Sequence, residues 1–161
     1  MYMKKLLLSA AVLFLTAGLF AGGGKEAPAV KSGQTADFAA CSVGDVKKAL
    51  TDAQSVVIDA RTGDAYIGWS IKGDTLAGHI KGAVDFSHRW IDSPYDDTKN
   101  LEQETRAQVL NEALQNKHIT KDKNLIVYDT NGSDAKKLAG FLQGLGFEKI
   151  RLFDAREWEG L

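Results

Sequence analysis

The stretch Leu125-Ile126-Val127-Tyr128-Asp129-Thr130-Asn131-Gly132-Ser133-Asp134 decides the fold. Its apolar first four residues are typical of a strand that is covered on both faces, and the polar residues after them form a short loop. Apolar residues then recur at helical spacing up to an expected stop at Gly146, namely Ala135, Leu138, Ala139, Leu142 and Leu145. Residues 149–153 are the next expected strand. The loop therefore follows the carboxyl end of a strand, where α/β sheets usually place their chemistry.

The same alternation of strands and helices continues toward the amino terminus. Ser42 is an expected N-cap for a helix whose inward face is Val43, Val46 and Leu50. Strands are expected near 37–40 and over 55–61, residues 78–84 are expected to lead into a strand through Phe86, and a helix is expected over 101–116. This order predicts an α/β domain with an open, mostly parallel sheet and helices on both faces.

The amino-terminal residues predict export. Lys4 and Lys5 precede an apolar run from Leu6 to Ala21 that is short for a membrane span, so we expect a signal peptide at 1–23 and no other membrane contact. Residues 24–36 are expected to be a flexible linker, and residues 37–161 the folded domain. Without the two leader lysines the net charge falls from −1 to −3, which excludes a basic nucleic-acid surface.

Three separate motifs resemble the rhodanese (thiosulfate sulfurtransferase) family, and they occur in the family's order. Asp59-Ala60-Arg61 followed by Asp64-Ala65-Tyr66 resembles the first signature. Gly78-His79-Ile80-Lys81-Gly82-Ala83 is similar to the family's Gly-His-Ile-Pro-Gly-Ala turn, with lysine in place of proline. Residues 125–129 resemble the strand before the family's active-site loop, and Leu145-Gly146-Phe147 the turn that follows. The resemblance implies a rhodanese-like α/β fold, an open parallel sheet of five strands with helices on both faces.

The resemblance also implies structural roles for the first two motifs. Asp59 and Arg61 would form an ion pair that braces loops at the carboxyl edge of the sheet, and Gly78, His79 and Gly82 would form a turn. From the residues alone, a partly exposed Asp59–Arg61 pair that contributes little is an equal alternative.

No other residues in the sequence indicate a metal or cofactor site. His88 and His118 each stand alone in a polar stretch, and no spacing of metal-ligating residues is present. The single cysteine, Cys41, allows no internal disulfide and is expected to act as a small core residue. We expect no metal and no cofactor.

The loop departs from the family at the position that carries its chemistry. The resemblance implies a cysteine at the first loop position, where backbone N–H groups at a helix N-terminus stabilise a thiolate and arginines hold the anionic sulfur donor. Here that residue is Asp129, which cannot form a persulfide, and residues 130–135 contain no Arg or Lys. We expect the side chain of Asp129 to accept the loop's own N–H groups. The degenerate active-site loop, with no catalytic residue, is Asp129, Thr130, Asn131, Gly132, Ser133 and Asp134.

These features favour an exported rhodanese-like domain that is inactive as an isolated chain. It would be the non-catalytic amino-terminal half of a tandem sulfurtransferase or a free-standing pseudo-enzyme, and its partner would be a catalytic rhodanese domain or another periplasmic protein. Two alternatives remain open. One is a periplasmic binding or interaction module that reuses the fold. The weaker one is a phosphatase-like enzyme that uses Asp129 as its nucleophile.

Overall fold

The computed structural model describes residues 37–69, 76–92 and 103–159. The expected signal peptide, 1–23, and the expected linker, 24–36, lie outside the described residues. No helix in the described ranges combines the length and the apolar character that crossing a membrane requires.

Within these described ranges, five parallel strands form one sheet, in the order β1-β5-β4-β2-β3. The long central strands are β2 (Ser55–Asp59), β4 (Asn124–Asp129) and β5 (Ile150–Asp154), whereas β1 (Ala39–Ala40) and β3 (Val84–Asp85) are short edge strands. The parallel α/β sheet expected from the sequence is confirmed. The expected strand through Phe86 is reduced to two ladder residues, although the Phe86 N–H still donates to the Asp59 carbonyl.

The helices begin and end close to the expected residues. Three belong to the expected framework: α1 (Val43–Ala49), α4 (Gln103–Asn116) and α5 (Asp134–Gly144). Ser42 caps α1 through a reciprocal capping box with Asp45, as its position before an apolar periodic run predicts. Single turns, α2 (Gly63–Tyr66) and α3 (Arg89–Asp92), follow β2 and β3, and a 3-10 helix, η2 (Ala155–Glu157), follows β5.

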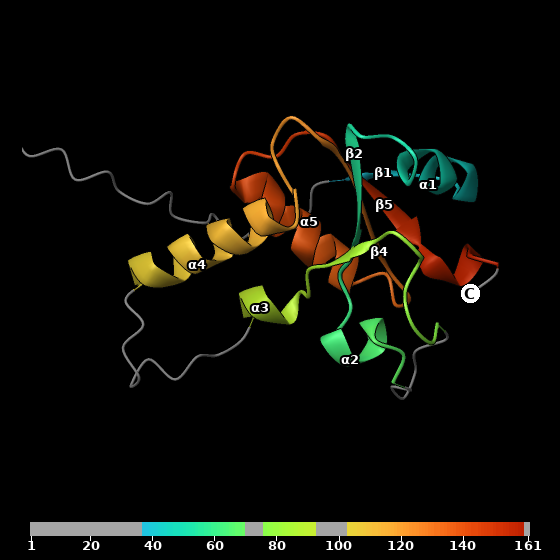
Figure 1. The fold of residues 1–161 in the computed structure, drawn as a ribbon, viewed down its shortest axis with the longest axis horizontal. Coiled ribbons are helices and arrows are strands. Elements are labelled where there is room, and N and C mark those ends of the chain that lie inside the picture. Colours follow the sequence, from blue (N-terminus) through green and yellow to red (C-terminus); the bar gives the residue numbers. More distant parts are fainter. Residues whose placement is uncertain (1–36, 70–75, 93–102, 160–161) are drawn as a thin grey trace, which may run out of the picture.

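Each face of the sheet is covered by its own hydrophobic cluster, because successive residues of a strand point to opposite faces. Leu125 and Val127 pack with Leu114 of α4 and with α5, whereas Ile126 and Tyr128 pack with α1 and the segment 76–83. In Figure 1 the sheet accordingly lies between α1 on one side and α4 and α5 on the other. This two-sided burial explains the continuous apolar run of β4.

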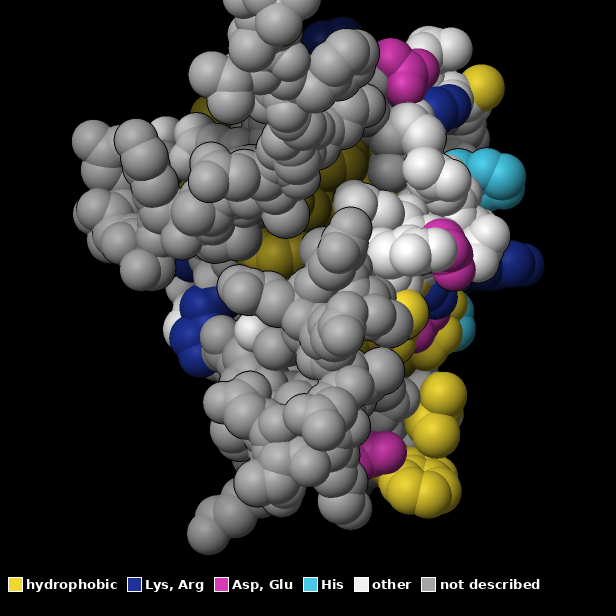
Figure 2. Space-filling view, turned by 90° about the vertical axis from the view of Figure 1, so that its left-hand side faces the viewer, with side chains coloured by type: hydrophobic (Ala, Val, Ile, Leu, Met, Phe, Trp, Pro, Cys, Tyr) yellow, Lys and Arg dark blue, Asp and Glu magenta, His cyan; other side chains and the backbone are white. Residues whose placement is uncertain are grey.

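The carboxyl ends of β2, β3 and β4 meet at one edge of the sheet. The Ala60 N–H donates to the Tyr128 carbonyl, and the His88 N–H donates to the Ala60 carbonyl. This edge also has exposed apolar side chains: Ile67 is 63% exposed and Trp69 is 66% exposed, just beyond α2. Figure 2 shows hydrophobic side chains on the surface at the lower end of the molecule, the end at which α2 lies in Figure 1.

Candidate functional site

The side chain of Asp129 lies inside its own loop. One carboxylate oxygen accepts the Gly132 N–H at 2.9 Å, and the other accepts the Ala135 N–H at 2.9 Å. The side chain is almost completely buried, with 2% of the residue exposed. Gly132 adopts a positive φ of 74°, which permits the tight turn that points its N–H inward. The expected arrangement, in which Asp129 accepts the loop's own N–H groups, is therefore present.

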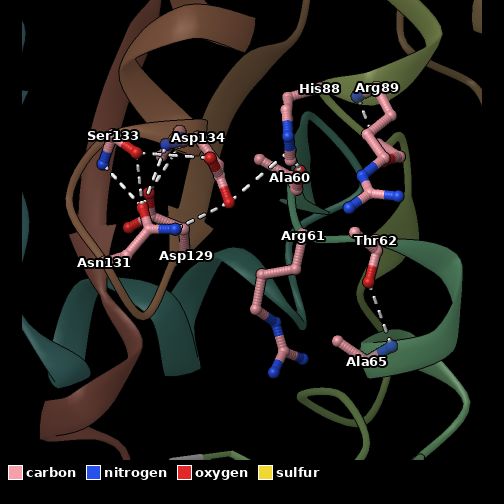
Figure 3. Close-up of polar contacts among 12 residues, drawn as sticks. Ala60, Arg61, Thr62, Ala65, His88, Arg89, Asp129, Asn131, Ser133 and Asp134 are labelled. Carbon is pink, nitrogen blue, oxygen red and sulfur yellow. Dashed lines mark hydrogen bonds and ion pairs between the residues drawn. The ribbon is translucent and has the colours of Figure 1, made fainter. Parts of the chain in front are cut away.

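Asn131 binds the remaining N–H groups at the start of α5. Its side-chain oxygen accepts the Ser133 N–H at 2.8 Å and the Asp134 N–H at 3.2 Å, and its amide nitrogen donates to the Asp134 carboxylate at 2.8 Å. The four consecutive N–H groups from Gly132 to Ala135 are thus all bound by two side chains of the same loop (Figure 3). An anion could use this helix N-terminus only by displacing the Asp129 carboxylate or the Asn131 amide oxygen.

Asp59 and Arg61 form a buried, bidentate ion pair. The Arg61 Nε donates to Asp59 Oδ1 at 3.0 Å, and the Arg61 Nη2 donates to Asp59 Oδ2 at 2.7 Å. Both residues are buried: Arg61 is 3% exposed and Asp59 is 0% exposed. Tyr128 completes the group: its hydroxyl donates to the Asp59 carboxylate at 2.8 Å and accepts the Ile80 N–H at 3.1 Å. Burial, reinforced by the Asp59 carboxylate, raises the pKa of Tyr128. The partly exposed alternative for this pair therefore does not apply.

The remaining donors of Arg61 hold the segment before the second motif. Its guanidinium donates to the Leu76 carbonyl at 2.7 Å and to the Gly78 carbonyl at 2.5 Å. In Figure 3 the guanidinium points away from the Asp129 loop. The Arg61 guanidinium therefore binds groups of the chain itself, whereas an arginine that binds a substrate needs N–H groups that point to the ligand.

The second motif forms a turn in which His79 has backbone and ring contacts. Its Nδ1 lies 2.9 Å from the Tyr66 carbonyl, and its ring stacks on the Tyr66 ring at 3.8 Å between centroids. Since a carbonyl only accepts, this nitrogen carries a proton and donates. Gly78 and Gly82 both have positive φ, 83° and 93°, a backbone conformation that the turn requires and that glycine adopts readily.

His88 has partners that the sequence pattern did not indicate. Its Nδ1 lies 2.9 Å from the Ala60 carbonyl and 3.5 Å from an Asp134 carboxylate oxygen, so it links the end of β2 to the start of α5 (Figure 3). The available signal was its position just after β3, at the edge where the Asp129 loop also lies. His88 therefore stands alone in the sequence but contacts residues of two other elements in the fold.

Cys41 lies apart from this group, directly before the α1 cap. It is partly buried against the cluster on the α1 face, and burial raises the pKa of its thiol to about 11. A thiol with this pKa is almost fully protonated at neutral pH, and the protonated form is a poor nucleophile. His118 is exposed after α4. Among the described residues, no group of three or more His, Cys, Asp or Glu side chains could hold a metal ion.

Comparison with known proteins identifies the family. A family model described as the rhodanese-like domain matches residues 42–155. The wild-type structure of EanB superposes with a TM-score of 0.62 at 22% identity, covering 78% of this chain and 26% of EanB. The anaerobic ergothioneine biosynthesis enzyme from Chlorobium limicola, in complex with trimethyl histidine, superposes with a TM-score of 0.59 at 22% identity, covering 73% of this chain and 24% of the enzyme.

The chain thus spans about a quarter of the length of the chain in each of these two structures, and at this identity the likeness concerns the fold alone. No curated protein matches the chain. The family match covers most of the chain and includes the Asp59, Gly78 and Asp129 motifs described above. The chain belongs to the rhodanese-like domain family.

Proposed function

We propose that this chain is an exported rhodanese-like domain that does not itself transfer sulfur. It serves either as the non-catalytic half of a sulfurtransferase or as a free-standing pseudo-enzyme. The observation that carries this proposal is Asp129, which occupies the position where the family resemblance places cysteine. Its two carboxylate oxygens accept the N–H groups of Gly132 and Ala135.

The chemistry of sulfur transfer supports the proposal. The reaction needs a thiolate that attacks the donor and carries the sulfur as a persulfide, and a carboxylate cannot do this. The carboxylates of Asp129 and Asp134 also repel an anionic sulfur donor at the start of α5. Cys41 is a poor substitute, because burial raises the pKa of its thiol to about 11.

A catalytic partner is consistent with the size of the chain. The chains in the EanB structure and in the Chlorobium limicola structure are about four times as long as the part that this chain matches, since the matches cover 26% and 24% of their lengths. A rhodanese-like fold therefore occurs within longer enzymes. In our proposal the catalytic residues belong to another domain or another protein.

An interaction module without any catalytic partner is a second candidate function. The exposed side chains of Ile67 and Trp69 favour it, because large apolar groups on a surface often contact other proteins. The phosphatase alternative gains no such support. The Asp129 carboxylate is buried and both its oxygens already accept hydrogen bonds, so it is poorly placed to attack a phosphorus atom.

Sulfur transfer from thiosulfate to cyanide by the purified chain tests the main proposal. We expect no thiocyanate above the rate without protein, and no gain of a sulfur atom in the intact mass after incubation with thiosulfate. The Cys41→Ala variant is the matched control, because it removes the only thiol. Thiocyanate formation that persists in Cys41→Ala would contradict the proposal. A metal-dependent phosphatase activity that is lost in Asp129→Ala would instead support the phosphatase alternative.

Export and partnership are tested on the protein in its native cell envelope. We expect it in the exported fraction without residues 1–23. An intact mass well above 17.5 kDa indicates a longer polypeptide, in which a catalytic domain is then sought. A mass slightly below this value indicates a separate domain, whose partner is then sought by crosslinking.

A further inference from the structure

We propose that the amino-terminal edge of the sheet carries a binding site for a small organic polyanion. A hollow of about 380 Å³ lies here, where α1 ends and β2, β4 and β5 begin. Its charged lining consists of Lys48, Lys149, Arg151, Asp45 and Asp52, and Ser55 and Asn124 add polar groups. The Asp129 loop lies at the opposite, carboxyl end of the strands, so this site is independent of the proposed loss of sulfur transfer.

Three cationic side chains reach the hollow from different elements. Lys48 belongs to α1, Lys149 directly precedes β5, and Arg151 lies within β5. The Lys149 ammonium donates to the Asp122 carbonyl at 3.1 Å and also interacts electrostatically with the Asp122 carboxylate, and two of its three N–H groups remain for a ligand. Arg151 pairs with Asp45 through one nitrogen at 3.2 Å, which leaves other guanidinium donors for a ligand.

The two carboxylates at the hollow already have local donors. Asp45 accepts the N–H and the hydroxyl of Ser42, at 2.9 and 2.7 Å. Asp52 accepts the Gln54 N–H at 2.9 Å and the Ser55 hydroxyl at 2.7 Å. These short-range bonds stabilise both carboxylates within the chain. Among the charged side chains that line the hollow, three cations thus lie beside two acids that already accept hydrogen bonds within the chain.

A second hollow of about 270 Å³ continues the site along the same edge. It shares Ala49, Asp52 and Ser55 with the first and adds two further cations, Lys117 and Lys123. Lys117 pairs with Asp85 at 2.5 Å, whereas Lys123 donates to the Ala53 carbonyl. Apolar side chains, among them Leu50 and Val84, also line this second hollow. A ligand that extends from the first hollow into the second meets cations along its length and some apolar wall.

These features specify the chemical class of the ligand. A hollow of this size admits a small molecule. The ligand should carry at least two anionic groups, because a single carboxylate could pair with only some of the cations that line the hollow. The amide of Asn124 and the hydroxyl of Ser55 suit additional hydroxyl groups. With a net charge of −1, the chain as a whole does not favour a long nucleic-acid polymer.

Citrate, with three carboxylates and one hydroxyl, is the probe for the test. The full chain, labelled with nitrogen-15, is titrated with citrate against sodium chloride of the same ionic strength, and backbone amide shifts are followed. We expect saturable shifts confined to the amino edge, around Ser55, Asn124 and Lys149. The double variant Lys48→Gln/Lys149→Gln should bind citrate about tenfold more weakly, because it loses two charged contacts.

The matched control is Lys136→Gln/Lys137→Gln, which removes the same charge from exposed positions on α5. Citrate affinity should be unchanged in this control. Shifts that fail to saturate would overturn the proposal, as would equal weakening by the two double variants, since both results indicate general screening of charge. Neither result would bear on thiocyanate formation, so a failure here is distinguishable from a failure of the proposed function.

Discussion

Asp129 determines what this loop can do, because its side chain occupies the N–H groups that an external anion would need. Its carboxylate accepts two N–H groups from a loop that is otherwise suited to an external anion. The bond to Ala135 also satisfies one of the free N–H groups at the start of α5, so the same interaction contributes to helix capping. An aspartate at this position is thus compatible with a stable loop.

Replacing Asp129 by asparagine should destabilise the domain by about 1–3 kcal/mol. The new amide nitrogen would face a backbone N–H, and two donors cannot pair. Urea unfolding measures the change, with Glu148→Gln as the control because it makes the same chemical change at an exposed position. Equal stability of the two variants would show that the hydrogen bonds of Asp129 contribute nothing.

Tyr128 should make the domain sensitive to alkali. Burial and the Asp59 carboxylate raise its pKa in the folded state, so the folded protein retains this proton at a pH where the unfolded chain has lost it. Stability is therefore unaffected below the ordinary tyrosine pKa of about 10 and falls as the pH rises above it. The Tyr128→Phe variant should lose less stability than the unchanged protein between about pH 9 and pH 11, a range of about one pH unit on either side of that pKa. Urea midpoints that fall equally with pH in the unchanged protein and in Tyr128→Phe would contradict this account.

At the scale of elements, the Asp59–Arg61 pair joins β2 to a segment distant in sequence. Arg61 connects Asp59 to the carbonyls of Leu76 and Gly78, and so fixes the turn that contains His79. The pair does this from a buried position at the carboxyl edge of the sheet. Removal of one partner is therefore more costly than for a surface ion pair, because the other charge stays buried.

Arg61→Met should destabilise the domain by about 3–5 kcal/mol, because it leaves a buried carboxylate without its partner. The double variant Asp59→Asn/Arg61→Met removes the uncompensated charge and should recover part of this loss. Unfolding in urea measures both variants. A single variant that is as stable as the double variant would contradict the argument.

The end of α4 has a different local constraint. His118 follows the helix with a positive φ of 57°, a conformation that disfavours residues with a Cβ. The Ile119 N–H donates to the Leu114 carbonyl at 2.9 Å, so the chain reverses here as in a glycine-terminated helix.

His118→Gly should stabilise the domain by about 0.5–1 kcal/mol, since the relief of strain exceeds the added entropy of the unfolded chain. His118→Ala retains a Cβ and is the control. Thermal unfolding compares the two variants. If glycine is no more stable than alanine, the backbone at this position is not strained.

At the scale of the whole molecule, the fold follows from patterns that are local in sequence. The continuous apolar run of β4, the helical spacing in α5 and the Ser42 cap predict elements that the structure contains. The family motifs supply the order in which they assemble. The paired strands, β2, β4 and β5, then form the centre of the sheet.

The contacts of the site were predictable only where donor and acceptor lie in one loop. Asp129 and the N–H groups it binds are at most six positions apart, so the loop alone suggested the arrangement. The Tyr128 hydroxyl reaches Asp59 across 69 positions, and His88 meets Asp134 only because β3 and α5 converge. Such contacts depend on strand order and side-chain direction, which hydrophobic periodicity does not encode.

The central claim is that Asp129 binds the N–H groups of Gly132 and Ala135 and so closes the loop to a sulfur donor. A titration of nitrogen-15-labelled protein with thiosulfate, at constant ionic strength, tests it most directly. The account predicts that the amides of Gly132 and Ala135 show no saturable shift and that the protein gains no sulfur. Saturable shifts of these two amides would contradict it, because thiosulfate would then be displacing the carboxylate from the loop.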